Sequence, residues 1–493
     1  MVLKDSISNP VKASGVLCHI TSLATSYGVG DFGPVAYEFI DHLADSHQHY
    51  WQILPIGNTN DSGCPYATDS AFGCADFYVS PDLLCKEYNI VPQKFNLYFS
   101  SKERVDFKNV ANNKRVILEA AFALFSPTPR YEAFLKDESS WIEAYALFRT
   151  FSETRGQDWR KWPTYQNAQS ELNEFEKQKY QFHLFAQFTC FNQLCELKKY
   201  ANKRNIKLVG DLPIFVSYFS MDVWKNPDQF YLEKGTYNMV YETGAAPDGF
   251  SATGQKWGTP IYDWEYQKKT NFQWWNERLS FLKRYFDVVR IDHFRGFNAT
   301  WISEVAAPDA ANGKWYPGPG SELFKNLKNY PEIIAEDLGY ITPDVDALRD
   351  EFGFPGMKVF QFMLGGDDNP HKLQNYTYNS AAYSGTHDCD TLMGWYKHLS
   401  PSEKEAINIE LNVSFPTHWD FLKILLRSPS KIVFIQVQDL LGLGSSARFN
   451  YPGTVQDVNW TWKLSFKETR HIDWARLGRL TLDAKRAVEN VCG

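Results

Sequence analysis

Residues 286–292 read FDVVRID, a short run of β-branched and apolar residues that ends in an acidic side chain. Seven other segments share this apolar character: residues 15–19 (GVLCH), 50–55 (YWQILP), 206–211 (IKLVGD), 333–336 (IIAE), 357–362 (MKVFQF), 381–387 (AAYSGTH) and 432–438 (IVFIQVQ). All but 50–55 end in or next to a polar residue. Near-continuous apolar runs of this length are typical of parallel strands that are buried on both faces. The sequence therefore predicts eight parallel strands.

Stretches with the period of an amphipathic helix stand between several of these strands. Residues 185–202 and 274–285 are two examples. Alternation of strands and helices around eight strands predicts an α/β fold, a (β/α)8 TIM barrel. An open, doubly wound parallel sheet is the alternative.

The spacing between the predicted strands is uneven, which indicates insertions. We expect residues 58–184 to form a mostly helical insertion between strands two and three, with helical segments around 114–125, 141–152 and 171–184. Residues 213–272 are rich in Gly, Pro, Thr and aromatic residues, and we expect them to build part of a substrate groove between strands three and four. The whole chain, 1–493, is interpreted as a single catalytic barrel without a separate C-terminal β-domain.

The composition is that of a mildly acidic globular protein. The 493 residues include 51 Lys and Arg against 58 Asp and Glu, a formal net charge of −7, so a nucleic-acid partner is not expected. A hydrophobic share of 44% and a charged share of 22% exclude wholesale disorder. Aromatic residues make up 16% of the chain, and such rings suit both cores and clefts that stack ligands.

Targeting and metal signals are missing from the sequence pattern. The first 14 residues have no apolar segment of a signal peptide, and the longest apolar runs are far shorter than the roughly 18 residues of a membrane span. We therefore expect a cytoplasmic protein without a membrane partner. The eight cysteines form no CxxC pair and no Cys/His metal pattern, which predicts reduced thiols rather than a metal site. Residues 28–33 (GVGDFG) fit a dinucleotide-binding pattern, but no strand precedes them, which disfavours that interpretation.

In a barrel, chemistry is located where the strands end. The predicted strand ends offer the following side chains: His19, Asp211, Arg290 with Asp292, Glu336 with Asp337, His387 with Asp388, and Gln438 with Asp439. Several carboxylates at one mouth, without an excess of basic residues, suit a neutral substrate. Two carboxylates that flank one bond can act as acid/base and nucleophile on a glycosidic linkage. Each residue taken alone is more often a helix cap or a loop anchor, so it is the set that favours catalysis.

Arg290 stands two residues before Asp292 and therefore points to the same face of the predicted strand. A guanidinium in that position can hold a neighbouring carboxylate in its ionised form, which a nucleophile requires.

These strand ends and the segments around them resemble the 4-α-glucanotransferases (amylomaltase or disproportionating enzyme), glycoside hydrolase family seventy-seven of the α-amylase clan. The matching segments are 209–216 (VGDLPIFV), 290–296 (RIDHFRG), 335–339 (AEDLG), 385–388 (GTHD) and the loop 250–262 (FSATGQKWGTPIY), with further matches at 14–22, 51–55, 438–444, 452–454 and 459–460. The matches run in order from about residue 14 to residue 464. The resemblance implies transfer of α-1,4-glucan segments between maltooligosaccharides, derived from glycogen or starch, without metal or cofactor.

The resemblance also implies roles for individual residues. Asp292 becomes the nucleophile that forms a glycosyl-enzyme, Glu336 the general acid and then the base, and Asp388 the third carboxylate, which grips hydroxyls of the distorted sugar. Four residues are implied around the same glucose subsite: Arg290, His387, Asp211 and Tyr66, with Tyr66 as the stacking platform. His19 is implied as a more peripheral sugar contact. Trp257 and Tyr262 are implied as further platforms, or as residues that stiffen their loop.

The sequence departs from the family pattern at four places. Cys389 stands where the family has Asn, and Phe219 stands where it has an acidic residue. Residues 64–67 (CPYA) replace Ser-Pro-Tyr-Gln, so that Ala67 stands for Gln, and residues 73–76 (GCAD) replace Ala-Gly-Asn-Pro. All three catalytic carboxylates are kept, which predicts an active enzyme. The rival hypotheses are an α-amylase-type hydrolase and a non-catalytic glucan-binding protein on the same scaffold.

Overall fold

The computed structural model describes residues 11–59, 62–95, 97, 103–247 and 251–488. Its centre is a closed barrel of parallel strands in the order β1-β12-β11-β10-β9-β6-β3-β2. The barrel strands are β1 (Ala13–Leu17), β2 (Tyr50–Gln52), β3 (Lys207–Pro213), β6 (Val288–Asp292), β9 (Glu332–Ala335), β10 (Gly356–Val359), β11 (Ser380–Tyr383) and β12 (Ile432–Gln436). Each of the eight predicted runs overlaps one of these strands. The predicted (β/α)8 barrel is confirmed, and the open sheet is excluded because the strands close on themselves.

The two-residue period of the strands sorts side chains between the inside and the outside of the barrel. In β6, Val288 belongs to the apolar cluster inside the barrel, whereas Val289 and Ile291 pack outward into the large core shared with the helices. Arg290 and Asp292 follow Val288 on the inner face. The same alternation places Val209 and then Asp211 on the inner face of β3, beside β6. Polar residues therefore replace apolar ones toward the carboxyl end of the barrel.

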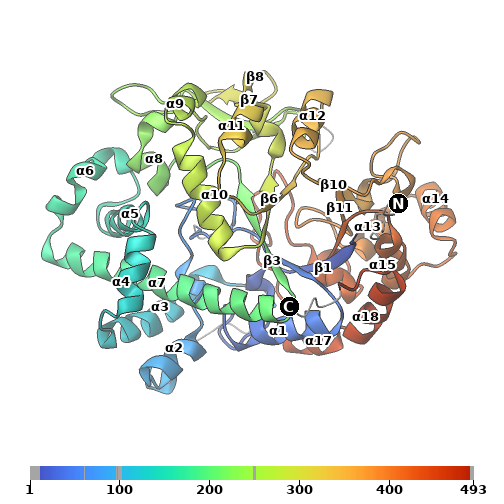
Figure 1. Cartoon of the computed structure of the whole chain (residues 1–493), viewed down its shortest axis with the longest axis horizontal. Helices are drawn as coiled ribbons and strands as arrows, with labels where there is room; N and C mark the ends of the chain where they lie inside the picture. Colours follow the sequence, from blue (N-terminus) through green and yellow to red (C-terminus); the bar gives the residue numbers. More distant parts are fainter. Residues whose placement is uncertain (1–10, 60–61, 96, 98–102, 248–250, 489–493) are drawn as a thin grey trace, which may run out of the picture.

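Helices cover the outside of the barrel (Figure 1). Beyond the connection from β2 to β3, the helices of at least four residues are α1 (Pro34–Asp45), α8 (Met221–Lys225), α9 (Trp264–Lys269), α10 (Gln273–Tyr285), α11 (Ser321–Asn326), α12 (Pro343–Glu351), α13 (Leu392–His398), α14 (Pro401–Leu411), α15 (His418–Arg427), α16 (Val437–Leu440), α17 (Phe466–His471) and α18 (Trp474–Asp483). The helix expected over 274–285 is α10.

Between β2 and β3 the described residues form a helical layer on one side of the barrel, drawn in blue to green in Figure 1. It contains α2 (Pro81–Tyr88), α3 (Phe107–Leu124), α4 (Pro129–Asp137), α5 (Ile142–Arg155), α6 (Tyr165–Ala168) and α7 (Glu174–Lys203). The stretches 171–184 and 185–202 are predicted as two helical segments, but residues 174–202 of them form the single helix α7. A capping box of Asn173 and Glu176 starts this helix, and it contains no Gly or Pro that would interrupt it.

A second, four-stranded antiparallel sheet lies outside the barrel, in the order β5-β4-β7-β8. The strands β4 (Tyr241–Ala245) and β5 (Gln255–Lys256) come from the segment after β3, and β7 (Ala299–Glu304) and β8 (Lys314–Pro317) come from the segment after β6. Two connections that are separate in the sequence therefore share one sheet. Phe250, part of the segment matched at 250–262, lies outside the described residues.

The cysteines correct one expectation. Cys74 and Cys190, 116 residues apart, form a disulfide, so the prediction that all eight thiols are reduced is wrong. Cys190 lies on helix α7, next to the segment that contains Cys74. Both sulfurs lie near the carbonyl oxygen of Ala75. No local spacing pattern marks such a pair, because only the packing of α7 brings the two residues together. Cys492 lies outside the described residues.

Across the described ranges, no helix combines the length and the apolar character that crossing a bilayer requires.

Candidate active site

A cleft of about 1060 Å³ opens at the carboxyl end of the barrel. Asp292 at the end of β6, Glu336 directly after β9, and Asp388 in the loop after β11 all line it. Four other residues singled out from the sequence line the same cleft: Tyr66, Trp257, Arg290 and His387. The structure thus brings together three carboxylates that are up to 96 positions apart in the sequence.

Arg290 connects one of these carboxylates, Asp292, to a fourth, Asp211. Its Nη1 atom donates to both oxygens of Asp211, at 3.0 and 2.8 Å, and its Nη2 atom donates to Oδ1 of Asp292 at 3.0 Å. Burial alone would lower the pKa of Arg290, but Asp211 and Asp292 outweigh burial and raise it well above its ordinary value. Arg290 is therefore a fixed positive charge directly beneath Asp292.

The surroundings of Glu336 favour its protonated, neutral form. Burial, together with the nearby negative charge of Asp292, raises the pKa of Glu336 to about 7, although Arg290 opposes the shift. The carboxylate accepts hydrogen bonds from the backbone N–H of His293 at 2.6 Å and of Leu338 at 2.9 Å. His293 adopts a left-handed backbone with φ of 53°, a conformation that costs free energy in a residue with a side chain. That turn directly after Asp292 directs the His293 N–H to Glu336 and fixes the two carboxylates relative to each other.

Asp388 is held by a different set of partners. His387 Nε2 lies 3.4 Å from Asp388 Oδ2, and Asn450 Nδ2 donates to Oδ1 at 2.6 Å. Burial would raise the pKa of Asp388, but His387 and Asn450 outweigh it and hold the pKa at about 2. Asp388 is therefore ionised at neutral pH. Asn450 was not among the residues proposed from the sequence, since no matched segment contains it.

Tyr66 forms an aromatic wall beside Asp388, together with His387 and Trp460. Its ring stacks on that of His387, with centroids 5.1 Å apart, and lies 5.8 Å from the ring of Trp460. Its hydroxyl donates to Asp211 at 2.9 Å. Trp460 was matched to the family only as part of a segment, and the structure adds it to the wall.

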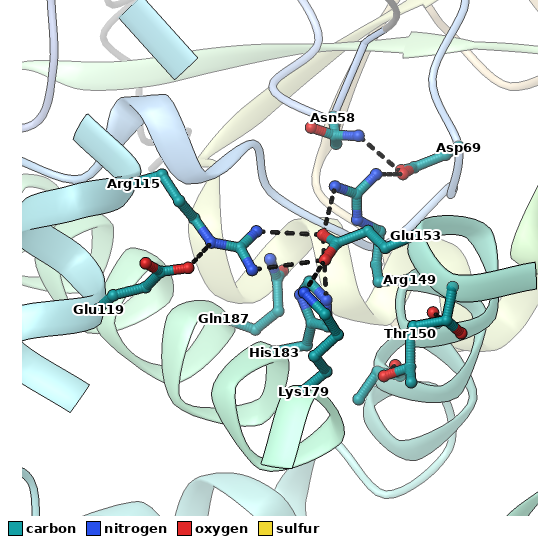
Figure 2. A network of polar contacts seen from close by, with 12 residues as sticks. Asn58, Asp69, Arg115, Glu119, Arg149, Thr150, Glu153, Lys179, His183 and Gln187 are labelled. Atoms are coloured by element: carbon teal, nitrogen blue, oxygen red, sulfur yellow. Dashed lines mark hydrogen bonds and ion pairs between the residues drawn. The ribbon is translucent and has the colours of Figure 1, made fainter. Parts of the chain in front are cut away.

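The loop that carries Tyr66 is anchored to the helical layer (Figure 2). Asp69, three residues after Tyr66, accepts hydrogen bonds from Asn58 Nδ2 and from Arg149 Nη1, both at 2.8 Å. Arg149 lies on α5, so one guanidinium joins the loop to this helix.

Arg149 is in turn held by Glu153, one turn further along α5 and 3.6 Å away. Figure 2 shows Glu153 at the centre of a charged network with Arg115 of α3 (3.0 Å) and, from α7, Lys179 (2.9 Å) and His183 (3.3 Å). Burial would raise the pKa of Glu153, but His183, Arg115 and Arg149 lower it far below its ordinary value. Three helices of the layer thus converge on the anchor of the Tyr66 loop.

Three predicted site residues do not line the cleft: Asp211, His19 and Tyr262. Asp211 instead accepts hydrogen bonds from Arg290 and balances its positive charge. Both ring nitrogens of His19 are engaged, Nδ1 by the N–H of Leu54 at 3.2 Å and Nε2 by the hydroxyl of Tyr78 at 2.9 Å. Burial, with a smaller contribution from His387, lowers the pKa of His19 to about 3, so His19 is neutral.

Tyr262 is fully buried and donates its hydroxyl to the carbonyl of Ile214 at 2.8 Å. Its ring packs against those of Phe230, Trp264 and Trp275. Trp257, in contrast, lies in the cleft with its ring 4.9 Å from that of His293.

Two of the departures from the family pattern, Ala67 and Cys389, also line the cleft. Within the described ranges no three His, Cys, Asp or Glu side chains are arranged to hold a metal ion. The carboxylates of the cleft instead have Arg290, His387, Asn450 and backbone N–H groups as their partners.

Comparison with known proteins identifies the family. A family model described as 4-alpha-glucanotransferase matches residues 18–469. The 4-alpha-glucanotransferase of Synechocystis sp. is 40% identical over 474 residues, covering 92% of this chain and 94% of that protein, and that of Clostridium butyricum is 39% identical over 467 residues, covering 90% and 95%. The solved structure of amylomaltase from Streptococcus agalactiae, in complex with acarbose, has 33% identity and a TM-score of 0.91, covering 96% of this chain and 99% of that one. The chain belongs to the 4-alpha-glucanotransferase family of enzymes.

Proposed function

We propose that the chain moves α-1,4-glucan segments between maltooligosaccharides by a double displacement in which Asp292, Glu336 and Asp388 are the catalytic residues. The observation that carries the proposal is the contrast between two carboxylates in one cleft. Asp292 is paired with a buried guanidinium, whereas Glu336 is buried and its pKa is raised to about 7. One group suits a nucleophile and the other suits a group that both gives and takes a proton.

The first displacement forms the glycosyl-enzyme. A carboxylate oxygen of Asp292 attacks the anomeric carbon while the bond from that carbon to the glycosidic oxygen breaks. Glu336 transfers its proton to the departing oxygen, which leaves as a hydroxyl of the released sugar. Asp388, ionised and held by Asn450, accepts hydrogen bonds from hydroxyls of the distorted ring.

The second displacement reverses the first with a different alcohol. Glu336, now a carboxylate, removes the proton from a hydroxyl of the acceptor glucan. The acceptor oxygen displaces Asp292, and the two inversions restore the α configuration. Transfer rather than hydrolysis requires that a bound acceptor outcompete water at about 55 M, which orientation in the cleft can supply through effective molarity.

The substrates that we propose are maltooligosaccharides released from glycogen or starch, and the proposed setting is the cytoplasm. Tyr66, His387, Trp257 and Trp460 present aromatic faces for sugar rings. The rival activity is hydrolysis of the same bonds.

Incubation of the purified protein with maltotriose alone tests the proposal. Transfer produces glucose and a ladder of longer oligosaccharides while the total of reducing ends stays constant. A rise in reducing ends with only shorter products would assign hydrolysis instead. Asp292→Asn is expected to abolish turnover of either kind while still binding maltooligosaccharides, and normal turnover in this variant would refute the assignment of the nucleophile.

A further inference from the structure

A second pair of aromatic rings lies in the cleft, outside the aromatic wall of Tyr66. Trp315 is on β8 of the antiparallel sheet, and Tyr340 is four residues after Glu336. Their rings stack with centroids 6.3 Å apart and planes 21° from parallel, and both residues line the cleft. Trp315 is 36% exposed and Tyr340 is 60% exposed. The pair is therefore an open aromatic surface that continues the cleft onto the second sheet.

Two neighbouring side chains, Arg295 and Trp301, hold this surface in place. Arg295 is buried and its guanidinium lies over both rings, 3.9 Å from the centroid of Trp315 and 5.3 Å from that of Tyr340. Arg295 also donates to the hydroxyl of Thr342 at 3.2 Å. The ring of Trp301, whose Nε1 donates to the carbonyl of Ala310 at 2.9 Å, meets Trp315 edge-on at 5.1 Å. A cation against an aromatic face attracts it and restricts its motion.

The location connects these rings to the reacting groups. Arg295 follows Asp292 by three residues, and Tyr340 follows Glu336 by four, so the barrel ends that carry the two carboxylates also supply this surface. Large apolar rings are costly to leave in water, and a rigid pair that is exposed in a binding cleft is typical of a ligand contact. Arg295 also lines the cleft, but it is only 6% exposed, so the surface offered to a ligand is mainly that of the two rings. The ligand that fits this surface is neutral and has an apolar face of C–H groups.

We propose that Trp315 and Tyr340 form a stacking subsite for a glucose unit of an α-1,4-glucan chain, beyond the units held at the three carboxylates. The inference rests on the proposed function, since it takes the same substrate class, and it adds a specificity determinant for chain length. A chain long enough to contact both the carboxylates and this subsite gains binding free energy that a short oligosaccharide does not gain.

The test compares kcat/KM for maltoheptaose with kcat/KM for maltotriose in Tyr340→Ala and in Tyr340→Phe. The loss of one stacking ring is expected to lower the ratio of the two constants about three- to tenfold in Tyr340→Ala, and Tyr340→Phe is expected to keep the wild-type ratio because it keeps the ring. Tyr231→Ala is the matched control, because Tyr231 is 52% exposed and does not line the cleft. An unchanged ratio in Tyr340→Ala, or an equal fall in Tyr231→Ala, would overturn the subsite.

The result separates this inference from the proposed function. If the wild type hydrolyses rather than transfers, the same ratio is measured from the release of reducing ends. If the wild type turns over neither substrate, the proposed function fails, and the subsite is tested by calorimetric titration of maltoheptaose into wild type and Tyr340→Ala. Equal dissociation constants in that titration would refute the subsite, and a three- to tenfold weaker constant for the variant would support it.

Discussion

Nη2 of Arg290 donates a 3.0 Å hydrogen bond to Oδ1 of Asp292, two residues further along the same strand. The two-residue period of β6 makes this contact possible, because it points both side chains into the barrel. The remaining face of the guanidinium is engaged by Asp211, whose side chain is fully buried. One residue therefore compensates the charge of two carboxylates, only one of which reaches the cleft.

Arg290→Met is expected to lower the free energy of unfolding by about 3–5 kcal/mol, since it leaves Asp211 buried without its cation. Urea denaturation at neutral pH measures the change. Arg130→Met is the matched control, because Arg130 forms an exposed pair with Glu196 that is worth at most about 1 kcal/mol. Equal losses of unfolding free energy in the two variants would contradict the interpretation that the ion pair of Arg290 contributes more because it is buried.

Glu336 should make the folded protein less stable as the pH rises. Because its pKa is raised from 4.5 to about 7 on folding, the folded state keeps a proton that the unfolded state loses between these values, and stability falls across that window. In Glu336→Gln this contribution is absent, so the variant gains up to about 3 kcal/mol relative to wild type between pH 4.5 and 8. Urea denaturation at several pH values tests this, with Glu405→Gln on the exposed face of α14 as control. A constant difference between Glu336→Gln and wild type at all pH values would contradict the raised pKa.

The pH dependence of activity follows from the same group. In the proposed mechanism the first displacement requires protonated Glu336, so kcat/KM is expected to fall about tenfold per pH unit above pH 7. The pH profile of kcat/KM with maltotriose, measured between pH 5 and 9, checks this limb. A profile that stays level up to pH 9 would exclude Glu336 as the proton donor.

The network around Glu153 is expected to affect catalysis through the Tyr66 loop. Arg149→Met removes the donor that joins Asp69 to α5, so Tyr66 loses its fixed position and kcat/KM falls about tenfold or more. Arg115→Met is the matched control, because Arg115 also pairs with Glu153 but does not contact Asp69. Both variants should be less stable, but only Arg149→Met should lose activity beyond the loss of folded protein, as measured by kcat/KM per folded molecule. An equal loss of activity in both would show that the network stabilises the helices without positioning the loop.

The barrel strands could be predicted because their information is local. In residues 286–292, Val288 and Val289 are apolar on both faces of the strand before Arg290 and Asp292 follow, and this pattern indicates a buried parallel strand whose end lies at the site. The carboxylates Asp292 and Glu336 could be placed in one cleft for the same reason, since parallel strands end at the same edge.

The remaining features depend on contacts between distant segments, which no local pattern encodes. The disulfide of Cys74 and Cys190 depends on how α7 packs, and the pairing of β4 with β7 depends on two connections that meet only after the barrel has closed. Asn450 contacts Asp388 from 62 residues away, so nothing in its own neighbourhood marks it. His19 ends a predicted strand like the other candidates, but the partners of its two ring nitrogens, Leu54 and Tyr78, are 35 and 59 residues away, so no local pattern indicates them.

The shared sheet has a consequence for how this protein can diverge or be engineered. Because β4 pairs with β7 along residues 241–244 and 301–304, the two connections exchange backbone hydrogen bonds and cannot change length independently. A chimera that takes only one of them from a relative would leave a mismatched register and unpaired backbone groups at the new edge. Swaps that aim to retune product length should therefore exchange the two connections together as one cassette.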